Sequence, residues 1–193
     1  MAATMQMAAL QGGFSEAPKE SAAAFRAAME AMARPGRLQE VSGATPPEGL
    51  SVAAAVLLLA LVDRTTPLHL APGHDGAAVR DWITFHCGAR LVAAEAAVFA
   101  LGSWAGLMPV SRFAIGTPEY PDRAATLIVE MPELRAEGVT LTGPGIQTTA
   151  ALNLPETEAF AENHALFPLG WDAFFTRGTQ LAALPRSTRI GAF

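Results

Sequence analysis

An arginine near the C-terminal end of the sequence has the surroundings that best fit anion binding. Arg186 follows Pro185, where a predicted strand ends, and Ser187 and Thr188 come next. A guanidinium group with neighbouring hydroxyls can bind the oxygens of a phosphate or a carboxylate. The same arginine would serve equally well in a surface ion pair, and the spacing of the residues does not distinguish these two roles.

Two loops offer further groups for such a site. The segment TGPG places Gly143 and Gly145 after a predicted strand, where bare backbone amides could meet a phosphate oxygen, although most loops of this kind are only turns. The segment GTPEYPDR, residues 116–123, has two prolines and charges of both signs, which is typical of a surface loop. Within it, Glu119 could accept a hydrogen bond from a ligand hydroxyl, but a solvated carboxylate is the more common state.

The sequence lacks the motifs of the common catalytic and metal sites. It has no G-x-S-x-G elbow, no Walker loop and no G-x-G-x-x-G fingerprint. His86 and Cys87 are adjacent and would point in different directions on a helix, and the other histidines show no ligand spacing. We therefore expect no metal site and no catalytic residue. Lys19 is the only lysine, so Schiff-base chemistry would have to use a residue in a short polar N-terminal segment.

Composition indicates one globular domain over residues 1–193. The chain is 51% hydrophobic and 16% charged, which is enough to bury a sizeable core. The formal charge of −5 comes without a basic stripe or a polybasic patch, so we expect neither nucleic acid nor a membrane surface as a partner. The longest apolar run, residues 52–62, is shorter than the roughly 20 residues that a membrane span needs.

The cysteine content and the N-terminal segment indicate a cytoplasmic protein. Cys87 is alone, which excludes a disulfide framework and fits a reducing compartment. The first residues carry no Lys or Arg before a mildly apolar stretch, which makes a poor signal peptide, and we expect residues 1–13 to be frayed.

Helical and strand patterns alternate along the chain. Ser51 is a predicted N-cap, Asp75 is another, and Phe25, Met29 and Met32 are predicted to share the buried face of the first helix. The alternation predicts an α/β domain with a mixed sheet flanked by helices on both faces. Helices are expected at 18–34, 52–62, 76–86 and 156–165, strands at 37–41, 68–71, 96–101, 126–131 and 138–142, and a closing hairpin at 174–184 that turns at Arg177-Gly178.

An ordered set of segments resembles the PhnH family, a core subunit of the bacterial carbon–phosphorus lyase machinery. The resemblance spans about residues 25–188, and the ordered set is more specific than any of its members. The segments are LLLALVDRTTPLHL, ITFHCGARLV, GTPEYPDRAATLIVEM, LTGPGI and FPLGWD…TRGTQLAALPRST.

The resemblance implies a fold and a role. The fold would be similar to the large domain of pyridoxal-phosphate-dependent transferases, without the cofactor or its lysine. The protein would form a homodimer and join PhnG, PhnI and PhnJ in a complex that uses ATP and a phosphonate to form a ribose 1-phosphonate 5-triphosphate, with release of adenine. The glycosyl transfer is attributed mainly to PhnI, so this chain would be an accessory subunit of the transferase complex and not catalytic alone.

Two alternatives to this role remain open. The chain could be a small-anion or nucleotide-binding protein, or an enzyme, with its own pocket built around Arg186, Glu119 and the Gly143–Gly145 loop. More remotely, it could be a pyridoxal enzyme that kept its cofactor.

The resemblance also implies site residues. Thr84 and Ser187 depart from the family pattern, and Thr84 lacks the charge expected before Phe-His. We expect FPLGWD to form a corner in which Pro168 fixes one backbone angle, Gly170 frees another and Asp172 binds neighbouring amides or Arg186. A ligand or subunit contact at this segment is the alternative. Candidate ligand-binding residues are Arg186, Glu119, Gly143, Gly145, Asp63 and Asp172.

Overall fold

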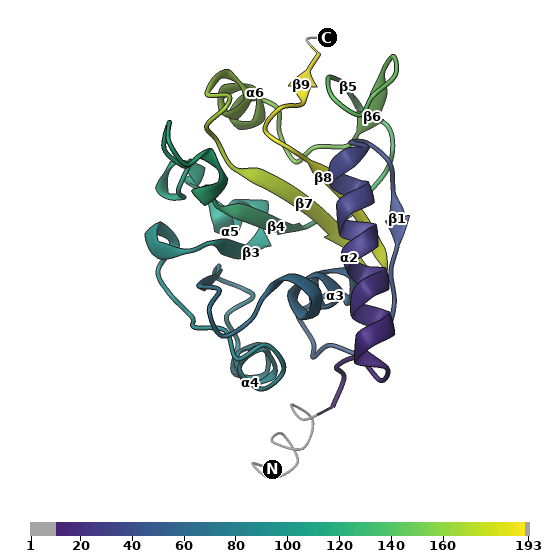
Figure 1. Cartoon of the computed structure of the whole chain (residues 1–193), viewed down its shortest axis with the longest axis vertical. Helices are drawn as coiled ribbons and strands as arrows, with labels where there is room; N and C mark the ends of the chain where they lie inside the picture. The colour runs from purple at the N-terminus through teal and green to yellow at the C-terminus, as the bar shows by residue number, and fades with distance from the viewer. Residues whose placement is uncertain (1–10, 192–193) are drawn as a thin grey trace.

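A mixed sheet of six strands forms the centre of the protein (Figure 1). The structure is a computed structural model that describes residues 11–191. The strand order is β1-β8-β7-β4-β3-β2. Strands β7, β4, β3 and β2 are parallel, β8 pairs antiparallel with β7, and β1 pairs antiparallel with β8. The strands are β1 (Gln39–Glu40), β2 (Leu68–Leu70), β3 (Phe99–Ser103), β4 (Thr126–Glu130), β7 (Asp172–Arg177) and β8 (Gln180–Leu184).

Both faces of this sheet are covered, which confirms the predicted mixed α/β class. Ile128 and Phe174 face one apolar cluster, and their neighbours Val129 and Phe175 face the other. This alternation follows from the two-residue period of a strand, and it makes each central strand apolar on both sides. The first face carries α2 (Ala17–Ala33), α3 (Val52–Leu61) and α4 (Ala77–His86), and the second carries α5 (Trp104–Leu107) and α6 (Glu158–Ala165).

A second, smaller sheet also packs on the face that carries α6. Leu141 and Leu152 from this sheet are fully buried in the same cluster as Phe160 of α6. Its order is β6-β5-β9, from β5 (Val139–Thr142), β6 (Ala150–Leu152) and β9 (Arg189–Ile190). The sequence predicted β5 as a strand but not β6 or β9. Short 3-10 turns complete the chain at η1 (Ala94–Ala96), η2 (Val110–Arg112) and η3 (Pro121–Arg123).

The predicted buried face of the first helix is wrong for Phe25 and Met29. Phe25 and Met29 of α2 are 50% and 56% exposed, and the buried positions are instead Ala24, Ala28 and Ala31. Alanine at these positions lets α2 lie close to α3. Of the larger side chains that periodicity selected, Phe25 and Met29 lie on the solvent side, whereas Met32 is partly buried against the core.

Local signals were confirmed at some points and corrected at others. The Ser51 hydroxyl accepts a hydrogen bond from Ala54 N at 3.1 Å, so Ser51 is the N-cap of α3. Gly76, and not Asp75, is the N-cap of α4, because Asp75 forms an ion pair with Arg80 instead. The hairpin is present, and its turn falls on residues 178–179, one position later than predicted.

Residues 11–13 belong to the folded part of the chain, although the sequence predicted them to be frayed. Residues 1–10 lie outside the described part of the chain, but Gln11 and Gly12 are tied to the fold. Gly12 O accepts a hydrogen bond from Thr45 N at 2.9 Å, and Gln11 O lies 3.1 Å from Nε2 of His86. The prediction that residues 11–13 are frayed is therefore wrong. Across residues 11–191, no helix is long and apolar enough to cross a membrane.

Candidate functional site

The edge of the sheet where β7 begins brings together the two charged residues singled out in the C-terminal segments. Asp172 is the first residue of β7, and Arg186 lies just beyond the end of β8. Because β7 and β8 are antiparallel neighbours, with Ala173 opposite Leu184, the two side chains meet. Their charged groups form a two-pronged ion pair, with Nε to Oδ1 at 3.1 Å and Nη2 to Oδ2 at 2.5 Å. The predicted contact between Asp172 and Arg186 is confirmed.

The other hydrogen bonds of Arg186 connect the end of the hairpin to the 116–123 loop and to α6. Arg186 Nη1 donates to Pro121 O at 2.8 Å, and Arg186 N donates to Asp172 Oδ1 at 2.8 Å. The Arg186 carbonyl lies 3.0 Å from Nδ1 of His164 on α6. Only 13% of the Arg186 side chain and 23% of the Asp172 side chain are exposed. These contacts give Arg186 a structural role that holds the loop of residues 116–123 against the end of the hairpin.

The FPLGWD segment is a corner, as predicted. Gly170 has a φ of +112°, a conformation that L side chains rarely adopt, and its amide donates to Ile115 O at 3.0 Å. The Asn163 side chain accepts from Trp171 N at 2.9 Å and donates to Trp171 O at 2.8 Å. The corner is thus fixed to α6 on one side and, on the other, to Ile115, the residue just before the 116–123 loop.

The other candidate ligand-binding residues do not form one cluster with Arg186. Gly143 packs beside the Ser187 carbonyl, next to the arginine, whereas Gly145 packs against Ala33 at the end of α2. Glu119 lies exposed in the 116–123 loop that Arg186 holds. Ligand binding by Arg186, Glu119, Gly143, Gly145, Asp63 and Asp172 stays a prediction.

Asp63 organises the tight turn that leads from α3 into β2. Its Oδ1 accepts hydrogen bonds from the Thr65 hydroxyl at 2.7 Å, the Thr65 amide at 2.8 Å and the Thr66 hydroxyl at 3.0 Å. These bonds stabilise the carboxylate, and the Thr65 hydroxyl is the largest cause that lowers the pKa of Asp63. The residue therefore has a clear local structural function in the DRTTP segment.

The lowered pKa of Asp63 gives a prediction for pH. A group whose folded-state pKa is depressed contributes stability above its unfolded-state pKa, and that stability is lost as pH falls through the folded-state pKa. An Asp63→Asn variant should therefore melt at a lower temperature than the unchanged protein near neutral pH. The gap should begin to narrow below about pH 5 and should close as pH falls through the lowered folded-state pKa. Thermal unfolding across this range measures it. Asp81→Asn, at an exposed aspartate on α4, is the matched control, and an equal and pH-independent gap for both variants would contradict the prediction.

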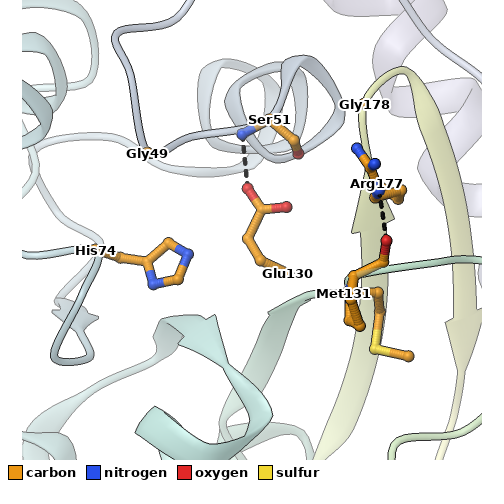
Figure 2. A pocket seen from close by; sticks show the side chains of 8 residues that line it. Gly49, Ser51, His74, Glu130, Met131, Arg177 and Gly178 are labelled. Atoms are coloured by element: carbon orange, nitrogen blue, oxygen red, sulfur yellow. Dashed lines mark hydrogen bonds between the residues drawn. The ribbon is translucent and has the colours of Figure 1, made fainter.

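The opposite edge of the sheet, where the parallel strands end, has a cavity of about 400 Å³ (Figure 2). We call it the strand-end cavity. His74 comes from the loop after β2, Glu130 ends β4, Arg177 ends β7, and Gly49 and Ser51 lie before α3. In open α/β sheets, ligands bind outside the carboxyl ends of the parallel strands. The remaining lining residues are Met131, Pro132 and Gly178.

Glu130 lines this cavity and is held by two hydrogen bonds. Its Oε1 accepts from Ser51 N at 2.7 Å, and its Oε2 accepts from the Thr176 hydroxyl at 3.0 Å. Figure 2 shows the His74 imidazole on one side of Glu130 and Arg177 on the other. The Arg177 Nε donates to Pro132 O at 2.7 Å, and Nδ1 of His74 is buried without a hydrogen-bond partner in the described part of the chain.

Sequence reasoning missed His74, Glu130 and Arg177. Each follows or ends a predicted strand, so the rule for parallel sheets would have selected them if the strand order had been known. The strand order could not be read from the sequence, because the neighbouring strands β4 and β7 are far apart along the chain.

Comparison with known proteins agrees with the resemblance. The family model described as "Bacterial phosphonate metabolism protein (PhnH)" matches residues 12–191. A protein of Rhizobium meliloti (strain 1021) named "Alpha-D-ribose 1-methylphosphonate 5-triphosphate synthase subunit PhnH" is 34% identical, over 97% of this chain and 98% of its own. The "Putative C-P lyase subunit protein HtxG" of Stutzerimonas stutzeri is 31% identical, over 91% of this chain and 87% of its own. The chain therefore belongs to the PhnH family of bacterial phosphonate metabolism proteins.

Proposed function

We propose that this chain is the PhnH-type subunit of a carbon–phosphorus lyase complex. In this role it supports phosphonate catabolism by helping the complex to form ribose 1-methylphosphonate 5-triphosphate from ATP and methylphosphonate, with release of adenine. The observation that carries the proposal is the end-to-end match with the Rhizobium meliloti subunit, which covers 97% of this chain and 98% of that one.

Accessory function, without catalysis by the chain alone, fits the contacts of the family segments. The Arg186 guanidinium binds Asp172 and Pro121 O, and Asp63 binds the hydroxyls of its own turn. These polar groups hold loops in place, and their hydrogen bonds are made within the chain. We therefore assign the glycosyl transfer to a partner subunit of the PhnI type.

The residues present do not fit a pyridoxal phosphate site. An internal aldimine needs a lysine, and Lys19 lies at the start of α2 with 81% of its side chain exposed, in an ion pair with Glu16. The strand-end cavity has no lysine in its lining. We propose that the fold is related to the large domain of pyridoxal-phosphate-dependent transferases, with the site put to another use.

The proposed assembly is a homodimer that joins PhnG, PhnI and PhnJ in the cytoplasm. Two exposed apolar pairs offer surfaces for these contacts: Phe25 with Met29 on α2, and Leu166 with Phe167 at the corner after α6. Large apolar side chains that lie together on a surface are typical of interfaces. The free and buried state of Cys87 fits a reducing compartment.

Co-purification tests this proposal. When the chain is co-expressed with PhnG, PhnI and PhnJ and pulled down by a tag on PhnI, we expect it in a fixed ratio to the other subunits. The matched comparison is a double variant, Phe25→Ser with Met29→Ser, which should keep the fold because both side chains are about half exposed. A chain that never co-purifies with the other subunits would contradict the proposal.

A further inference from the structure

We propose that the strand-end cavity binds a phosphorylated sugar, with the phosphate at Arg177 and the sugar hydroxyls at Glu130. The proposal concerns the isolated chain and goes beyond its role in a complex. The cavity lies at the edge where the parallel strands end, so segments that follow or end β2, β4 and β7 line it together. The volume of about 400 Å³ lies within the usual range of small-molecule sites, about 300–1,000 Å³.

Arg177 supplies the anion-binding end. A second cavity of about 710 Å³ shares Pro132, Arg177 and Gly178 with the first, so Arg177 lines both cavities. Its Nε is bound to Pro132 O, which orients the guanidinium. The donors of the two terminal nitrogens make no hydrogen bond or ion pair with residues 11–191. A guanidinium oriented in this way can bind two phosphate oxygens at once.

Arg135 differs from Arg177 in its ion pairs. It lines the second cavity and forms ion pairs with Glu133 at 3.0 Å and with Glu137 at 2.8 Å. Arg177 is exposed at the end of β7 and forms no ion pair with residues 11–191. Its guanidinium is therefore open to an anionic ligand.

Glu130 supplies the hydroxyl-binding end. Each carboxylate oxygen already accepts one hydrogen bond from the protein, from Ser51 N and from the Thr176 hydroxyl. A carboxylate has about four acceptor positions, so about two remain for a ligand. A second anion beside Glu130 would be repelled, whereas hydroxyl groups would donate to it. The cavity thus has one end for an oxyanion and one end for hydroxyls.

The α3 N-terminus is not the anion site. Ala53 N donates to Gly178 O at 2.8 Å, and Ala54 N donates to the Ser51 hydroxyl. Ser51 N donates to Glu130, so the protein itself supplies the negative charge at this end of the helix. The ligand phosphate is therefore assigned to Arg177 alone.

Isothermal titration calorimetry on the purified chain tests the proposal with ribose 5-phosphate, inorganic phosphate and ribose. We expect ribose 5-phosphate to bind at least about tenfold more tightly than phosphate or ribose, because only it reaches both ends. ATP is titrated as a further ligand, because it carries phosphate groups and a ribose together with a base.

Two variants decide whether Arg177 is the anchor. Arg177→Gln should weaken ribose 5-phosphate binding by about tenfold or more, since hydrogen bonds to charged groups are the strong ones, while Arg135→Gln should leave it unchanged. Thermal melting confirms that both variants fold. The proposal is overturned if neither ribose 5-phosphate nor ATP binds, if phosphate alone binds equally well, or if the two variants have the same effect. Arg177→Gln should still co-purify with the other subunits, so these results are independent of the proposed assembly.

Discussion

Replacing Gly145 with alanine is expected to lower the free energy of unfolding by about 2–5 kcal/mol. Gly145 has a φ of +81°, and a Cβ at this position would lie 1.9 Å from the backbone carbonyl oxygen of Ala33. The obstacle is main chain at the end of α2, which cannot turn aside as a flexible side chain can. The substitution would combine left-handed strain with displacement of the 143–146 loop from α2.

Gly73→Ala is the matched control for this effect. Gly73 has a φ of +91°, but nothing lies within 4 Å of the point that a Cβ would occupy, so alanine there adds only backbone strain, about 1–2 kcal/mol. Chemical denaturation of both variants separates the two contributions. Equal losses for Gly145→Ala and Gly73→Ala would show that the contact with Ala33 carries no weight.

Replacing Asp172 with alanine is expected to lower the free energy of unfolding by about 2–4 kcal/mol. The change leaves the guanidinium of Arg186, whose side chain is 13% exposed, without its anionic partner, and it removes the acceptor of Arg186 N. Losing one member of a mostly buried pair is more damaging than losing the pair, because a desolvated charge remains. The loop of residues 116–123 should loosen, since Arg186 also holds Pro121 O.

A double-mutant cycle with Arg186→Gln measures the coupling between the two side chains. We expect the double variant to be less destabilised than the sum of the single variants, because both lose the same interaction. Asp75→Ala is the control: it removes an exposed pair with Arg80, whose side chains are 34% and 50% exposed, and should cost less than about 1 kcal/mol. Additive effects at Asp172 and Arg186 would contradict a shared structural role.

Local sequence signals predicted the elements whose cause is also local. The apolar run of α3 behind Ser51, the strand that ends at Glu130 and the hairpin after Asp172 all follow from short-range patterns. The contact between Asp172 and Arg186 could also be predicted from the sequence, because a tight hairpin places its two outer ends side by side.

The errors arise where tertiary packing decides. On α2, the close approach to α3 selects alanines for the interface and leaves Phe25 and Met29 outside. The pairing of β5 with β6 and β9 depends on segments with weak strand patterns, at most four residues long. The strand-end cavity needs the order of the parallel strands, because that order alone brings His74, Glu130 and Arg177 to one edge.

The central claim, that this chain is an accessory subunit of a carbon–phosphorus lyase complex, is tested most directly by adenine release. The assay combines ATP and methylphosphonate with PhnG, PhnI and PhnJ, with and without this chain, and with this chain alone. The account predicts adenine release by the complete set, little or none when the chain is omitted, and none from the chain by itself. An unchanged rate without the chain, or adenine release by the chain alone, would contradict it.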